Sequence, residues 1–340
     1  MKFITTFTLV AFCCIAQAND QLRFNFDVTG NTGLRAGADA GLQQAADFWS
    51  AQFTDDIEVN VTVRFETRGQ FFVAEARSTD ALYPYSDFRT ALVNDALSAD
   101  DASYSSSLPA GDDFSVYINR TSESLAPFVD NDGGANNTQV LLNNANAKAL
   151  GLLSPTQAGE DVEIIFTNGL FFDFDASDGV SPGQQNFVGI AIHELGHALG
   201  FTSGVSTLDD SGTDLNDDFF TEVSALDFAR HSPDSTAAGA GLDFTADTRP
   251  KFYSIDGGET AGGGLVDGLD HFSLGTVNGD GQSASHWRDG ILGDGVQLGI
   301  LDPTPLTAQE ISISSPRSIF KQLTLLDSTP LWPLSQQACS

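Results

Sequence analysis

The chain has 340 residues, with 46 acidic residues against 15 lysines and arginines, and a formal net charge of −31. A protein this acidic repels phosphate groups, which argues against nucleic acids and anionic membranes as partners. The length is enough to bury a large core and predicts one large domain of two lobes, or two domains. We interpret the charge mainly as a source of solubility outside the cell, with calcium binding as the alternative.

The first 18 residues are typical of a secretory signal peptide. A lysine precedes the apolar run Phe3–Ile15, and Ala16-Gln17-Ala18 follows it, a sequence that suits signal-peptide cleavage. The run is shorter than the roughly 20 apolar residues of a transmembrane helix. Residues 1–18 therefore predict a secreted or periplasmic protein without a membrane anchor. The mature chain, 19–340, would keep Cys339 as its single cysteine and form no internal disulfide.

The first part of the mature chain alternates between strand and helix patterns. Residues 21–30 and 57–66 alternate apolar and polar side chains, whereas residues 40–53 carry apolar residues at helical spacing. Strand, helix and strand in this order predict an α/β beginning. The following patterns predict, in chain order, a helix at 87–98, a strand at 114–120, a short helix at 146–153 that ends near Gly151, and a strand or hairpin at 161–175.

The second half of the chain is less regular. Residues 187–200 are apolar on almost every side, as in a buried helix. From Val205 to about Gly281 the sequence is rich in Gly, Asp, Ser and Thr, which predicts a long, mostly irregular insertion. Residues 316–328 predict a last helix. Two Asp-rich stretches, 130–137 and 173–179, are candidate calcium (Ca²⁺) loops, although neither has EF-hand spacing and Asp-Gly runs are typical of turns.

The sequence HELGH lies within the predicted buried helix. His193 and His197 are four residues apart, so both imidazoles face one side of the helix and can bind one metal ion. Glu194 lies about 100° further around the helix, where it can act as a general base on a water molecule without being a ligand. Gly200 occupies the position where a left-handed residue would end the helix. Two histidines and a glutamate buried without a metal would be costly, so we predict a zinc (Zn²⁺) site.

A zinc site of this kind needs three protein ligands, and the spacing alone does not identify the third. A compact motif would place it at Ser203, which is a poor zinc ligand. Glu222, on a following helical segment, and His271 are two other candidates. His231 follows a probable helix and is expected to be solvated, which makes it a weaker candidate.

The last histidine stands in a distinctive context. His286 lies in Ser285-His286-Trp287, and Gly299-Ile300-Leu301-Asp302-Pro303 follows. Together with HELGHALGF, this arrangement resembles the metzincin metalloproteases, which share HExxHxxGxx(H/D) and a later turn beneath the zinc that usually carries methionine. It is most similar to the leishmanolysin-like branch, in which a long insertion precedes a third histidine followed by tryptophan. FDFDASDG at 172–179 is similar to a stretch of exported bacterial proteases of this type. The specific similarity covers about residues 165–205 and 283–328.

The resemblance implies a metzincin-like α/β (α+β) fold of two lobes around an active-site cleft. The lobe at 19–204 would contain a twisted sheet and the active-site helix, and the lobe at 205–340 would be rich in loops. In such proteases an edge strand pairs with an extended substrate, and residues 169–175 are the candidate for it here. The resemblance also implies a monomeric zinc endopeptidase that acts on protein or peptide substrates.

The resemblance also implies a role for each site residue. His193, His197 and His286 would hold the zinc, and Glu194 would be the general base. Leu301 takes the place of the methionine in the turn, because Met1 is the single methionine of the chain. Leucine and methionine have similar volumes, and such exchanges usually cost less than ~1.5 kcal/mol, so we expect the turn to be retained. The alternatives are a non-catalytic exported binding or surface protein with this fold, and an HExxH hydrolase that uses Glu222.

Overall fold

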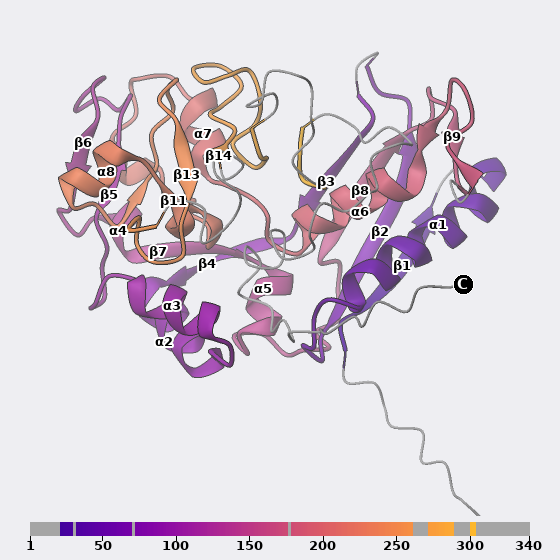
Figure 1. The fold of residues 1–340 in the computed structure, drawn as a ribbon, viewed down its shortest axis with the longest axis horizontal. Helices are drawn as coiled ribbons and strands as arrows, with labels where there is room; N and C mark the ends of the chain where they lie inside the picture. The colour runs from indigo at the N-terminus through magenta and orange to yellow at the C-terminus, as the bar shows by residue number, and fades with distance from the viewer. Residues whose placement is uncertain are drawn as a thin grey trace, which may run out of the picture.

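The structure is a computed structural model that describes residues 21–29, 32–69, 72–175, 178–260, 271–288 and 300–303. The expected signal peptide and the expected last helix at 316–328 lie outside the described residues. None of the described helices is both long and apolar enough to cross a membrane. The architecture is a mixed α/β arrangement of small sheets and helices (Figure 1).

The largest sheet has four strands in the order β1-β2-β8-β3. Its members are β1 (Arg23–Thr29), β2 (Glu58–Glu66), β8 (Val162–Thr167) and β3 (Ala74–Ser78). The first three strands are parallel, and β3 runs antiparallel to β8 at one edge. The strands expected at 21–30 and 57–66 are confirmed. The alternation in β2 buries Val59, Val61 and Val63 on one face, which is how a half-buried strand contributes to a core.

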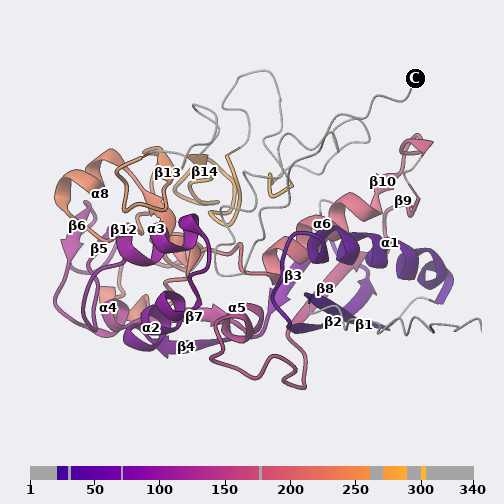
Figure 2. The ribbon, with the colours of Figure 1, turned by 60° about the horizontal axis from the view of Figure 1, so that its bottom comes forward.

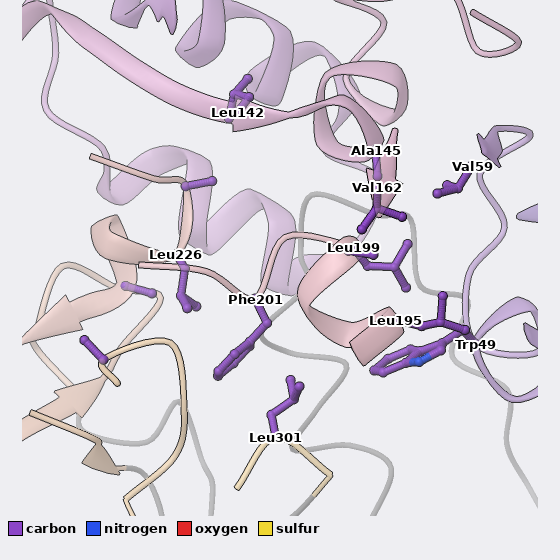
Figure 3. Close-up of a cluster of buried hydrophobic side chains, with 14 of the residues drawn as sticks. Trp49, Val59, Leu142, Ala145, Val162, Leu195, Leu199, Phe201, Leu226 and Leu301 are labelled. Atoms are coloured by element: carbon purple, nitrogen blue, oxygen red, sulfur yellow. The ribbon is translucent and has the colours of Figure 1, made fainter. Parts of the chain in front are cut away.

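Two helices, α1 (Thr32–Ser50) and α6 (Phe187–Ala198), pack against each other and cover the same face of this sheet (Figure 2). The indole N–H of Trp49, in α1, donates to the backbone oxygen of Ile192 in α6 at 2.9 Å. Trp49 also meets Leu195, Leu199, Phe201 and Leu301 in one buried cluster (Figure 3). The apolar pattern of α6 thus fixes the helix within the core rather than on the surface.

Most of the remaining elements lie to the left of this sheet in Figure 1. From the first half of the chain they are β4 (Asp80–Pro84), α2 (Tyr85–Asp95), α3 (Ala99–Ser107), β5 (Val116–Ile118), β6 (Phe128–Asp130), α4 (Ala135–Thr138) and β7 (Gln139–Asn143). From the second half they are α7 (Val205–Asp210), α8 (Pro233–Ala238), β11 (Arg230–His231), β12 (Leu242–Asp243), β13 (Lys251–Tyr253), β14 (His271–Phe272) and the 3₁₀ helices Asp217–Phe219 and Leu226–Ala229.

Segments from both halves of the chain form this second group together. β12 pairs in parallel with β5, and the hydroxyl of Tyr104 donates to the backbone oxygen of Ala225. The two halves expected on either side of residue 204 are therefore interwoven, because residues 80–143 pack with residues 205–260.

The segment 205–281 is mostly irregular, as its composition predicts. Short helices and strands interrupt its described part, but most of the described residues lie in turns and loops. At α8, for example, the side chain of Ser232 accepts a hydrogen bond from the backbone of Ser235 at the start of the helix, and Gly239, with a φ of 72°, ends it. Serine and glycine thus cap one of the short helices, and the prediction is confirmed for the described part of the segment.

The stretch 161–175 does not form a hairpin. β8 is paired on both sides, with β2 and β3, so it offers no edge to the residues that follow it. Instead β9 (Phe172–Asp173) pairs in parallel with β10 (Gln185–Asn186). The expectation that residues 169–175 form the edge strand of the sheet was wrong, since β3 occupies that position.

The turn that follows α6 is held by asparagine side chains. Gly200 has a φ of 110°, a left-handed conformation that confirms its predicted role at the end of the helix. The short helix α5 (Asn144–Ala149) lies beside it. The side-chain amides of Asn143 and Asn146 donate to the backbone oxygens of Ala198 and Leu199, respectively. These bonds satisfy carbonyl groups that have no partner within the helix.

We predict that Gly200→Ala destabilises the protein more than Gly151→Ala. A Cβ at Gly200 would lie 2.2 Å from Oδ1 of Asn146, whereas a Cβ at Gly151 would meet nothing within 4 Å. Both glycines have positive φ values, 110° and 68°, so both alanines carry backbone strain of about 1–2 kcal/mol. The collision at Gly200 should add about 1–3 kcal/mol to the loss in free energy of unfolding. Urea denaturation measures both variants, and equal losses would contradict the proposed steric conflict.

Candidate metal centre

Three histidine side chains converge beside α6. The Nε2 atoms of His193 and His197 are 3.0 Å apart, and those of His193 and His286 are 3.3 Å apart. Tetrahedral nitrogen ligands at the usual zinc distance are separated by about 3.3 Å. Among the described residues, these three form the one group of at least three His, Cys, Asp or Glu side chains whose ligand atoms could share a metal ion. The structure thus brings together the three histidines that the sequence suggested.

Backbone carbonyl groups fix the orientation of the three rings. The Nδ1 atoms of His193 and His197 each lie 2.7 Å from a carbonyl oxygen, of Ile300 and Phe201, respectively. Nδ1 of His286 lies 3.3 Å from the carbonyl oxygen of Ser283. A carbonyl oxygen can only accept, so each Nδ1 must carry the hydrogen. In a neutral imidazole the lone pair is then on Nε2, the atom that faces the other two rings.

Burial keeps these rings neutral. Burial, and secondly the neighbouring histidine, lowers the pKa of His193 and of His197 to about 3. Burial likewise lowers the pKa of His286 to about 4, with His193 as the second cause. Three lone pairs therefore face one another with no proton to share. A cation at their centre removes this repulsion, and three imidazole nitrogens are a ligand set that zinc accepts in open catalytic sites.

Glu194 lies next to this cluster without belonging to it. Its side chain is buried, and Oε2 has no hydrogen-bond partner. Burial and then the negative charge of Glu75 raise its pKa to about 8, while a hydrogen bond with the backbone of Ala76 lowers the pKa in part. A metal cation on the three histidines would favour the charged form of this carboxylate. Glu194 is also one of the residues that line a cleft beside the three histidines.

The turn at 300–303 connects two of the histidines. Ile300 accepts the hydrogen bond from His193, and the backbone N–H of Trp287, directly after His286, donates to the carbonyl oxygen of Leu301 at 3.0 Å. The Leu301 side chain is fully buried against α6, and a Cβ added to Gly196 would lie 2.7 Å from its Cδ2 atom. Leu301 is thus buried against α6, as expected if the turn is retained (Figure 3).

The other candidate ligands have different partners. The hydroxyl of Ser203 donates to Asp227, and Glu222 accepts a hydrogen bond from the hydroxyl of Thr207. His231 is fully buried, with Nε2 3.1 Å from the carbonyl oxygen of Phe228. The expectation that His231 is solvated was therefore wrong, because the paired strand β13 and the preceding 3₁₀ helix pack against it. His271, in β14, is likewise outside the histidine cluster.

A cleft of about 450 Å³ opens above the three histidines. Residues 72–76, which include the start of β3, line it together with α6, Thr202 and residues of the segments 283–286 and 302–303. β3 is paired with β8 only, among the described strands. The segment AEARS contains little sign of a strand, because it is short and its two apolar residues are alanines, which are depleted in strands.

The Asp-rich stretches use their carboxylates in local hydrogen bonds. Asp130 is buried and accepts from the side-chain amides of Asn136 and Asn137 at 2.7 and 3.1 Å. Asp173 accepts from the backbone N–H groups of Asp175 and Ser181. In the described residues, neither stretch contributes to a group that could hold a metal ion. Calcium binding therefore has no support from these carboxylates.

Comparison with known proteins adds no family assignment. Neither the protein-family models nor the curated proteins nor the solved structures gave a significant match to this chain. The metal centre is therefore described by its own geometry.

We predict that His286→Ala lowers zinc affinity by at least about 100-fold, more than the 10–100-fold typical of losing an outer-shell partner. The substitution removes one of the three converging nitrogen atoms. His231→Ala is the control, because it removes a fully buried imidazole from outside the cluster and should leave zinc affinity unchanged. Competition with a chromophoric chelator measures both. Equal affinities of wild type and His286→Ala would show that His286 is not a ligand.

We also predict that Leu301→Met changes the free energy of unfolding by less than ~1.5 kcal/mol, because the volume beneath the helix is nearly conserved. Leu301→Ala should cost about 2–5 kcal/mol, since it leaves a cavity against Gly196 and Trp49. Chemical denaturation of both variants tests this packing. An alanine variant as stable as the methionine variant would contradict it.

Proposed function

We propose that the protein is an exported zinc-dependent endopeptidase with a metzincin-like fold. One observation carries this proposal: three neutral imidazoles present their Nε2 atoms to a common point, and Glu194 is among the residues that line the same cleft. The motif HELGHALGF, the remote His286-Trp287 pair and the buried Leu301 turn support the metzincin resemblance. Residues 1–18 support export.

The side chains around the metal centre suit hydrolysis. Zinc, when bound, lowers the pKa of water towards about 7 and polarises a substrate carbonyl group. Glu194 can accept the proton of the attacking water on its free oxygen and then deliver it to the leaving amine. The carboxylate of Glu194 is buried by its neighbours, so bulk solvent does not readily exchange protons with it. The three histidines hold their rings in place through the carbonyl groups of Ile300, Phe201 and Ser283.

The neighbouring edge strand favours an extended peptide as the substrate. Residues 72–76 line the cleft, and β3 lies at the edge of the sheet. An extended chain can add to such an edge through backbone hydrogen bonds, which do not depend on the side chains of the peptide. This arrangement would place a peptide bond next to Glu194 and the histidines, and it supports an endopeptidase over a hydrolase of small molecules.

We predict that Glu194→Gln keeps zinc but lowers kcat by at least ~10²-fold, the lower end of a general-base contribution. Glutamine has nearly the same shape but cannot take up the proton. Glu222→Gln is the matched control, because Glu222 contacts Thr207 and not the histidines. Casein hydrolysis and the zinc content of both purified variants are the measurements. Wild-type turnover by Glu194→Gln would rule out the role. Absence of hydrolysis by the zinc-loaded wild type would favour a non-catalytic binding protein.

A further inference from the structure

Ser203 stands where a compact motif would place the third histidine, yet its side chain faces away from the other two. Its hydroxyl donates to Oδ1 of Asp227 at 2.5 Å, and the next backbone N–H, of Gly204, donates to Oδ2 at 2.9 Å. The N–H and hydroxyl groups of Ser224 also donate to Oδ2 of Asp227. This carboxylate is completely buried. It therefore fixes the turn after α6 through both Ser203 and Gly204.

The fixed turn contacts the segment that carries His286. The backbone N–H of Ser203 donates to the hydroxyl oxygen of Ser285 at 3.0 Å, across a separation of 82 residues. Nearby, the hydroxyls of Ser206 and Ser283 are 3.3 Å apart. The carbonyl oxygen of Ser283 is in turn the acceptor for Nδ1 of His286. Two serine contacts thus attach this segment to the chain directly after the active-site helix.

A third contact holds the loop that precedes this segment. Asp209, in α7, is buried and accepts from the backbone N–H groups of Val277 and Asn278, each at 2.8 Å. Residues 203–209 thus carry hydrogen-bond partners for both the loop at 277–278 and the segment at 283–285. A ligand so distant in the sequence needs such contacts. Without them, the residues around it would become ordered only when the metal binds, and their loss of conformational entropy would weaken the binding.

From these contacts we infer that Ser203 and Ser285 are positioning residues for the third ligand. Ser203 occupies the position of the third histidine of the compact motif and is held by Asp227. Its backbone binds the remote segment, and this contact orients His286. The inference rests on the proposed metal site but concerns different residues. Groups that hydrogen-bond to metal ligands commonly contribute 10–100-fold to metal affinity. The contact between Ser203 and Ser285 acts one residue away from the ligand, so we expect a contribution at the lower end of this range.

The test is a double-mutant cycle on zinc affinity, with zinc itself as the probe and chelator competition as the readout. Ser285→Ala removes the acceptor of the Ser203 N–H and should lower zinc affinity about 10-fold. Ser285→Thr keeps the hydroxyl and should retain the affinity. In the His286→Ala background, Ser285→Ala should have no further effect, because it acts through His286. Ser232→Ala is the control: it removes a buried serine that caps α8, away from the three converging histidines, and should lower stability without changing zinc affinity.

The possible outcomes are distinguishable. If the wild type binds no zinc, or His286→Ala binds it as tightly, the proposed metal site fails and the inference fails with it. If His286 is a ligand but Ser285→Ala binds zinc like the wild type, only the positioning role is overturned. An equal loss of affinity from Ser285→Ala in both backgrounds also overturns it, because the effect would then come from folding and not from His286.

Discussion

Three imidazole lone pairs that face one another are the constraint on which the arrangement of this protein depends. Each ring is held by a backbone carbonyl group on its Nδ1 side, so that Nε2 cannot turn away or carry the hydrogen. Burial also disfavours protonation, as the lowered pKa values of all three rings show. Such a group is electrostatically unfavourable by itself. It becomes favourable when a cation occupies its centre, which links metal binding to the stability of the surrounding segments.

The carbonyl groups belong to three separate parts of the chain, and each is fixed by the core. Phe201 follows the turn at Gly200, where asparagine side chains from the neighbouring α5 cap the end of α6. Ile300 precedes Leu301, which is buried against Gly196. A side chain at position 196 would push this turn away from the helix. Glycine in the centre of the motif helix, a residue that normally weakens helices, is thus explained by the close approach of the turn.

Local patterns predicted the parts of this structure that depend on local chemistry. The strand, helix and strand at the beginning, the buried helix with HELGH and the left-handed Gly200 all follow from periodicity and backbone preferences. His286 could be identified as the third ligand only through the resemblance, because its neighbours in the sequence do not indicate how far it lies from His193. Three features could not be predicted: the edge position of β3, the burial of His231 and the packing of residues 80–143 with residues 205–260. They arise from contacts between segments that are distant in the sequence, and periodicity carries no information about such contacts.

The zinc coordination shell is the most direct test of this account. X-ray absorption spectroscopy at the zinc edge of the purified, zinc-loaded protein should show three imidazole ligands at about 2.0–2.1 Å and one further light atom, with no sulfur at about 2.3 Å. This result would place the metal on His193, His197 and His286 and leave one position open. A shell with fewer than three imidazoles, or one containing the sulfur of Cys339, would contradict the central claim that the three converging lone pairs form the metal site.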